Sequence, residues 1–189
     1  AIDHYHRYRE DVARLKEFGM QAYRFSVCWP RVLPEGTGTP NEAGLDFYDR
    51  LIDALLDAGI TPHLMMFHWD YPLALFRRGG WCNPDSAEWF AEYAAFLVNR
   101  YSDRVAHWYT LEEIACFIGL GLYNGIHAPG LKLPLGEVLQ AGHNALKGHG
   151  RAVQVLRAGA KQPLAIGFVP SVGLYFPDDE SNEADVEAA

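Results

Sequence analysis

The chain has 189 residues, of which 49% are hydrophobic and 21% are charged, a composition typical of a folded globular protein and not of a disordered one. Its net charge of −8 gives no long-range attraction to phosphate backbones or anionic lipid, which argues against nucleic acid and membrane surfaces as partners. The longest apolar runs, Thr61 to Phe67 and Leu164 to Val169, are far shorter than the about 20 residues of a membrane helix. We expect one domain over residues 1–189.

The first part of the chain alternates helical and extended patterns. A helix is expected from about His4 to Phe18, with Gly19 as a C-terminal cap in the left-handed backbone conformation. A strand is expected at Ala22 to Val27. Asn41 is the expected cap of a second helix that ends at Gly59, and the apolar run Thr61 to Phe67 is the next strand.

The second part continues this alternation. Pro84 and Asp85 are expected to open a third helix, and Val105 to Leu111 to form a strand. A long helix over Leu135 to Ala158 leads to a fourth strand at Leu164 to Val169. Apolar strands separated by amphipathic helices predict an α/β protein built of parallel βαβ units, with both faces of the sheet covered.

The last residues, Asp178 to Ala189, have cap candidates in Asp179 and Ser181 and resemble the first turns of a further helix. A closed eight-stranded barrel takes about 250 residues, and this chain supplies only about four strands. Either the sheet is open or the protein is part of something larger. No glycine-rich phosphate loop follows a strand, so a nucleotide cofactor is not expected.

The three cysteines, Cys28, Cys82 and Cys116, are widely spaced and show no metal-type pairing. We expect them to be reduced, mostly buried thiols in a reducing compartment. The sequence shows no basic and apolar leader, so a signal peptide is expected to be absent or already removed. These two observations favour a cytoplasmic location.

Three strand ends carry the residues most suited to chemistry: Ser26 to Arg31, His68 to Asp70, and Thr110 to Glu113. In parallel α/β folds the carboxyl ends of the strands meet at one edge, where functional residues gather. Aromatic faces stack on sugar rings, polar groups hold hydroxyls, and a carboxylic acid can protonate a glycosidic oxygen. The sequence therefore favours a carbohydrate site at this edge.

Each candidate also has a structural interpretation. Trp29 and Trp69 fit core packing as well as sugar contact, and His68 fits a structural histidine as well as a ligand. For Glu113 a catalytic role is favoured over a structural one. Glu112 is a second carboxylate beside it, and two adjacent negative charges are unfavourable and tend to raise the pKa of one of them.

Other polar residues are less specific. Arg24 lies in an apolar strand, where a buried cation needs a carboxylate partner of structural or catalytic kind. His127, His143 and His149 lack metal-ligand spacing and are expected to be structural. No metal is expected.

Several groups of residues along nearly the whole chain resemble the family 1 glycoside hydrolases, which include the β-glucosidases. They are Asp3-His4-Tyr5, Ala22-Tyr23-Arg24-Phe25-Ser26, Trp29-Pro30-Arg31, Leu33-Pro34, Asn41-Glu42-Ala43-Gly44, Phe47-Tyr48, His68-Trp69-Asp70, Pro72, Gly79-Gly80-Trp81 and Gly125-Ile126-His127-Ala128-Pro129-Gly130. The resemblance implies a (β/α)8 barrel of which this chain supplies about strands two to five. It also implies cleavage of β-linked glucosides or galactosides with retention and without a cofactor.

The resemblance also implies a role for each matching site residue. Glu113 falls on the family's acid/base glutamate, His68 on a histidine that holds sugar hydroxyls, and Arg24 on the arginine that supports the nucleophile. Trp69 and Trp29 resemble the aromatic wall of the sugar pocket.

Two departures from the family pattern concern catalysis. The family reads Thr-(Leu/Phe)-Asn-Glu-Pro around the acid/base, whereas this chain has Glu112 in place of Asn and Ile114 in place of Pro. An amide at that place donates to the sugar 2-hydroxyl, while a carboxylate only accepts. The family's nucleophile segment, Thr-Glu-Asn-Gly, and its first strand with a sugar-binding glutamine do not occur in this sequence.

Three hypotheses follow. The first is a fragment or truncated homologue of a β-glucosidase-like enzyme that acts on a β-glycoside or oligosaccharide. The second is a non-catalytic pseudoenzyme or sugar-binding half-barrel, favoured by Glu112 and Ile114. The third is an assembly unit, because an open parallel sheet has two unpaired edges that can pair with another copy or with a complementing half-barrel.

Overall fold

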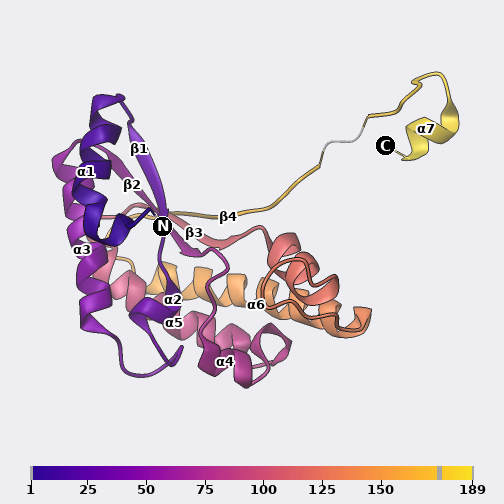
Figure 1. The fold of residues 1–189 in the computed structure, drawn as a ribbon, viewed down its shortest axis with the longest axis horizontal. Coiled ribbons are helices and arrows are strands. Elements are labelled where there is room, and N and C mark those ends of the chain that lie inside the picture. The colour runs from indigo at the N-terminus through magenta and orange to yellow at the C-terminus, as the bar shows by residue number, and fades with distance from the viewer. Residues whose placement is uncertain (1, 174–175, 189) are drawn as a thin grey trace.

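The computed structural model describes residues 2–173 and 176–188. Its centre is a parallel sheet in which the strands lie in chain order, β1 (Ala22–Ser26), β2 (Thr61–Phe67), β3 (His107–Glu112) and β4 (Ala165–Val169) (Figure 1). Parallel neighbours are joined by right-handed crossovers, so consecutive strands that advance in one direction place their helices on the same face. This is the arrangement of a barrel wall.

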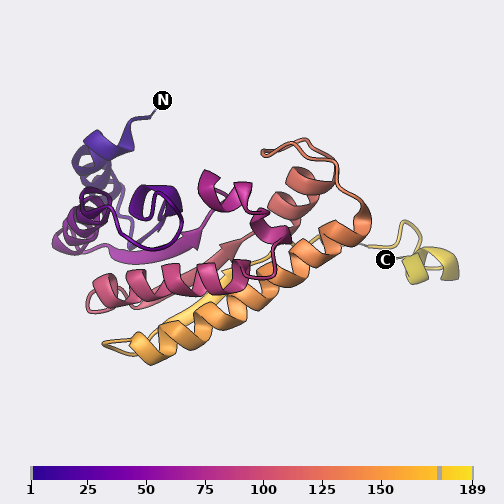
Figure 2. The same ribbon diagram turned by 90° about the horizontal axis from the view of Figure 1, so that it is seen from below.

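The helices form a layer outside this wall, with α1 packed on α3 and α5 packed along α6 (Figure 2). The α-helices are α1 (His4–Glu17), α2 (Trp29–Val32), α3 (Glu42–Asp57), α4 (Leu73–Arg77), α5 (Ser86–Tyr101), α6 (Leu135–Gly159) and α7 (Glu183–Ala188). Two further segments are the 3-10 turn η1 (Gly80–Cys82) and the π-helix η2 (Ala115–Tyr123). No helix in the described ranges is long and apolar enough to cross a bilayer.

The predicted long helices and the four strands are present, with ends shifted by no more than a few residues. Gly19 ends α1 with a φ of 70°, as expected. Asn41 is the N-cap residue of α3, as expected, but its side chain makes no capping hydrogen bond, because its Nδ2 donates to the carbonyl of Arg31. This hydrogen bond ties α2 to the start of α3.

The C-terminal helix begins later than its predicted caps. Asn182 caps α7, since its Oδ1 accepts from the backbone nitrogen of Ala184. Asp179 instead accepts from Ser181 within the preceding turn, so neither of these two residues caps the helix. Helix α7 has no buried residue, and Ala189 lies outside the described residues.

The prediction that both faces of the sheet are covered is wrong for this chain. Arg24 of β1, His63 of β2 and His107 of β3 lie in register on one row, and β1 alternates so that Arg24 is exposed while Phe25 is buried. The two histidine rings stack on this open face with their centroids 4.3 Å apart. All covering helices lie on the other face, because every crossover has the same hand.

Between the sheet and the helix layer lies one apolar cluster rich in large aromatic side chains. Tyr93 and Tyr101 of α5 are fully buried, and each satisfies its hydroxyl by donating to a backbone carbonyl, of Met66 at 2.8 Å and of Leu45 at 2.9 Å. Burying such a side chain stabilises the fold by roughly 1.5–3 kcal/mol. The Tyr93 hydroxyl thereby ties α5 to the end of β2.

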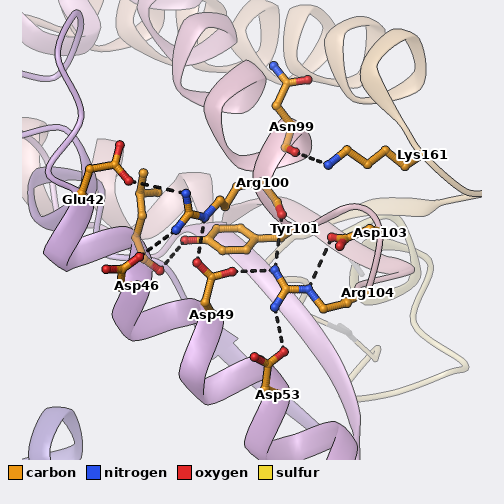
Figure 3. Close-up of polar contacts among 11 residues, drawn as sticks. Glu42, Asp46, Asp49, Asp53, Asn99, Arg100, Tyr101, Asp103, Arg104 and Lys161 are labelled. Carbon is orange, nitrogen blue, oxygen red and sulfur yellow. Dashed lines mark hydrogen bonds and ion pairs between the residues drawn. The ribbon is translucent and has the colours of Figure 1, made fainter.

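An ion-pair network joins α3 to the end of α5 (Figure 3). Asp49 is its centre, because it accepts from Arg100 at 2.7 Å and from Arg104 at 2.5 Å. Asp46 and Asp53 extend the pairing on either side, each at 2.7 Å. Several charges that share partners in one geometry stabilise more than isolated surface pairs do.

Asp49→Asn is expected to lower the free energy of unfolding by about 1–2 kcal/mol, because two guanidinium groups lose one shared carboxylate. Urea unfolding of the 189-residue chain measures this. Asp103→Asn is the matched control, since Asp103 makes one exposed contact to Arg104 at 3.4 Å, and its expected effect is within about 0.5 kcal/mol. An equal loss in the free energy of unfolding of the two variants would show that Asp49 stabilises the fold no more than a singly paired carboxylate does.

Candidate active site

The candidate site lies where β3 ends. Glu112 is the last residue of β3, and Glu113 follows it with a φ of 46°, in the left-handed region. The Glu113 nitrogen donates to the Val169 carbonyl of β4 at 2.7 Å, and its own carbonyl accepts from the Cys116 nitrogen at 2.8 Å. Such a backbone conformation is costly for a residue other than glycine and clusters at functional sites. It turns the chain from strand to helix at Glu113.

Trp69, after the neighbouring strand β2, has the same kind of backbone, with a φ of 80°. Its Nε1 donates to the Glu112 carbonyl at 3.1 Å. Its ring lies 5.2 Å from the ring of His68 and 5.3 Å from that of His127. The ends of β2 and β3 are therefore joined through one indole, which is half-buried at this edge.

Glu112 forms a two-pronged ion pair with Arg24, although the two residues are 88 positions apart. Arg24 Nη1 lies 2.6 Å from one carboxylate oxygen and Nη2 lies 3.1 Å from the other. The Glu112 side chain is 7% exposed and that of Arg24 is 41% exposed. The expected carboxylate partner of Arg24 is thus Glu112, but the expectation that this cation is buried is wrong, because it lies on the open face.

Cys116 adds a polar contact that the sequence did not indicate. Burial, followed by the hydrogen-bonded carboxylate of Glu113, raises the pKa of the Cys116 thiol. The thiol is therefore protonated at neutral pH, so that it is a neutral donor toward Glu113. Sequence spacing did not predict the pair of Cys116 and Glu113, because the two residues come together only where η2 begins after the turn at Glu113.

Trp29 does not belong to the site, and the expectation that it forms part of the sugar pocket wall is wrong. Its side chain is fully buried and stacks on Tyr93, with ring centroids 4.8 Å apart. Its Nε1 donates to the Gly36 carbonyl at 2.9 Å. The chain turns into the one-turn helix α2 at this residue, which directs the indole into the core.

His68 is exposed and, together with Arg24, lines a cavity of about 340 Å³ at the β1 end of the sheet. His149 bonds the Thr110 hydroxyl at 2.7 Å, and burial lowers its pKa, in keeping with a structural histidine. Within residues 2–173 and 176–188, no three His, Cys, Asp or Glu side chains are grouped to hold a metal ion. The hydrogen-bonded centre of the site is Arg24, Glu112 and Trp69, with His68 and Glu113 beside it.

Fold and site together define a partial (β/α)8 barrel with two carboxylates and an aromatic residue at its strand ends. The family model of Glycosyl hydrolase family 1 matches residues 1–189. The chain therefore belongs to Glycosyl hydrolase family 1.

Two curated relatives resemble the chain over nearly all of its length. Beta-glucosidase A of Thermotoga maritima is 46% identical over 183 residues, which cover 97% of this chain and 41% of that protein. A 1,4-beta-D-glucan glucohydrolase of Thermotoga neapolitana is 46% identical over 189 residues, which cover 44% of that protein. The chain spans about two fifths of the length of these relatives.

Solved structures give the same result. The Family 1 b-glucosidase from Thermotoga maritima superimposes with a TM-score of 0.93 over 98% of this chain and 41% of that one. The Thermotoga maritima enzyme in complex with glucoimidazole gives a TM-score of 0.94 at 46% identity. The predicted family and the predicted partial barrel are confirmed.

Proposed function

We propose that this chain carries the acid/base half of a retaining β-glycosidase site, with a β-glycoside or oligosaccharide as substrate. The position of Glu113 is the main observation behind this proposal. It is a half-buried carboxylic acid at a strained strand end, beside an aromatic wall residue, Trp69. The names of the relatives, Beta-glucosidase A and 1,4-beta-D-glucan glucohydrolase, agree with it.

In the proposed reaction Glu113 protonates the glycosidic oxygen as the aglycone leaves and then takes a proton from the attacking water. A second carboxylate, about 5–5.5 Å away on the opposite side of the sugar, forms the glycosyl–enzyme bond. Glu112 does not fit that role, because both of its oxygens are held by Arg24. The proposal therefore places the nucleophile in a segment that this sequence does not contain, as the family resemblance implies.

Sugar binding without turnover is the second candidate function, and the Glu112–Arg24 ion pair favours it. The pair occupies the position where the family has an amide, and the Glu112 carboxylate is already satisfied by two charge-assisted hydrogen bonds. A carboxylate so engaged offers a sugar hydroxyl only an acceptor and never a donor.

Association with another copy or with a complementing half-barrel is a further proposal. Among the described strands β1 pairs only with β2, and β4 pairs only with β3, so each has one free edge that is able to accept a further strand. Molecular mass in solution tests this proposal. A monomer at working concentration, unchanged by the remaining barrel segment of a relative, would exclude both forms of association.

A cytoplasmic location is proposed on the three cysteines alone. Cys28, Cys82 and Cys116 are all free, which suits a reducing compartment. The expectation that they are mostly buried is wrong, because each is only partly buried. Thiol counting after rapid alkylation of cells that produce the chain tests this, and oxidised cysteines in that sample would argue against it.

A chimeric barrel tests the catalytic proposal. It has residues 1–189 of this chain in place of the matching segment of Thermotoga maritima Beta-glucosidase A, whose sequence identity of 46% and TM-score of 0.93 favour correct assembly. We expect the isolated chain to hydrolyse a nitrophenyl β-glucoside no faster than its own Glu113→Gln variant. The chimera carrying Glu112→Asn should hydrolyse it in a Glu113-dependent way. A folded chimera without such activity would contradict the catalytic proposal and favour sugar binding without turnover.

A further inference from the structure

The open face of the sheet, opposite the helix layer, carries a row of basic side chains from three strands. Arg24, His63 and His107 lie in register across β1, β2 and β3. The row ends at β4, where Ala165 lies in register with His107 and brings no titratable group. Both histidines are half-buried although no helix covers them. A titratable pair therefore lies in the middle of the open face.

The pair is arranged in a way that disfavours positive charge. The rings of His63 and His107 stack almost in parallel, with their centroids 4.3 Å apart and an angle of 9° between their planes. Two imidazolium charges at such a separation repel each other. Burial, followed by the neighbouring His107, lowers the pKa of His63. The stack thus favours neutral rings.

The charged and titratable groups around the pair do not offset a positive charge on it. Arg24 is itself a cation, and its carboxylate partner Glu112 is already held through both oxygens. The Tyr109 hydroxyl lies 3.0 Å from His63 Nδ1, and a phenol carries no charge at neutral pH. In the described part of the chain, neither histidine of the pair forms an ion pair with a carboxylate.

A complementing half-barrel is the partner that this face fits. The chain superimposes on the Family 1 b-glucosidase from Thermotoga maritima with a TM-score of 0.93 while it covers 41% of that chain, so the sheet has the shape of one segment of a closed wall. Helices surround such a barrel, and its interior is a packed core. The helix-free face is therefore an interior face. A second copy fits less well, because it would set the same basic row against itself.

We propose that covering of this face by a complementing half-barrel requires both His63 and His107 to be neutral, so that acid favours the open form. This inference rests on the proposed association and adds its pH dependence. Protons that bind the open form better than the closed one shift the equilibrium toward the open form as the pH falls. A free imidazole has a pKa of about 6.5. The closed form therefore keeps its full stability above about pH 6.5 and loses stability below it.

Guanidinium unfolding of the chimeric barrel at pH 7.5 and at pH 5.5 tests this, because unfolding uncovers both rings. Each histidine that must be neutral in the closed barrel raises the unfolding equilibrium constant about tenfold between these pH values. The rise should therefore be about 100-fold larger than in the chimera with His63→Phe and His107→Phe, which keeps two flat rings that bind no proton. In the isolated chain this difference should be less than about tenfold, because one of the two rings can take up a proton from water there.

Two further chimeras are controls. His63→Gln with His107→Gln also removes both titratable rings, should give the pH dependence of the phenylalanine pair, and replaces that pair if it does not fold. His143→Gln removes an exposed histidine of α6 and should leave the rise unchanged.

Three results would overturn the proposal. The first is an equal pH dependence in the chimera and in its pair variants, and the second is an equal effect of the pair in the chimera and in the isolated chain. The third is a chimera that the pair stabilises at pH 5.5, as a carboxylate supplied by the other wall would do. The readout is unfolding, so a loss of glycoside hydrolysis does not change the result.

Discussion

In the chimeric barrel, Glu112→Asn is expected to raise kcat/KM for an aryl β-glucoside by about 100-fold or more. The substitution restores a donor amide where Glu112 only accepts, and the loss of one such transition-state donor costs on the order of 100-fold to 1000-fold. It also releases Arg24 from the ion pair that now holds it at 2.6 and 3.1 Å. Steady-state kinetics of the two chimeras measure the change.

Two comparisons show whether the amide is the cause. Glu112→Gln removes the same charge but places its amide one methylene further out, so it should recover only part of the gain. A 2-deoxyglucoside lacks the hydroxyl that the amide is expected to hold, so the gain from Glu112→Asn should largely vanish with it. An equal gain in kcat/KM on both substrates would assign the effect to the release of Arg24 or to the loss of the Glu112 charge. No gain in kcat/KM on either substrate would contradict the hypothesis of a damaged catalyst.

Glu113→Gln, placed in the active chimera, should lower kcat/KM for an alkyl β-glucoside by about 100-fold to 10,000-fold. The amide cannot protonate the leaving oxygen. An alkoxide leaving group needs this protonation far more than a dinitrophenolate does. The loss in kcat/KM should therefore be much smaller for a dinitrophenyl glucoside, whose first step needs little acid help.

Glu137→Gln, on the exposed face of α6, is the control for carboxylate loss and should change neither rate. A Glu113→Gln loss of similar size for both leaving groups would contradict the acid/base assignment and would indicate a positioning or structural role.

The sequence was sufficient to predict the long elements because their signals are strong. The apolar run at Thr61–Phe67 and the stripe of α3 each bury a continuous apolar surface, which fixes where strand and helix lie. The one-turn helix α2 and the π-helix η2 were not predicted. Four residues are too few for a periodic pattern, and the apolar, glycine-containing η2 favours no single face.

The site was predicted in part. Glu112, Glu113 and Trp69 were expected together at one edge, because parallel strands end there. The same rule gave a wrong prediction for Trp29. The direction of a side chain after a strand depends on whether the chain enters a loop or a helix, and at Trp29 it enters the helical turn α2. The partner of Arg24 could not be predicted, because Arg24 and Glu112 are 88 positions apart in sequence and lie on strands with β2 between them.

The central claim, that Glu113 is the acid/base of a retaining β-glycosidase, is tested most directly by azide rescue. In the Glu112→Asn chimera, Glu113→Ala should leave a glycosyl–enzyme intermediate that water attacks slowly without a base. Azide needs no base, so it should restore turnover of a dinitrophenyl β-glucoside and yield the β-glucosyl azide. No acceleration by azide, or formation of the α-azide, would contradict the assignment.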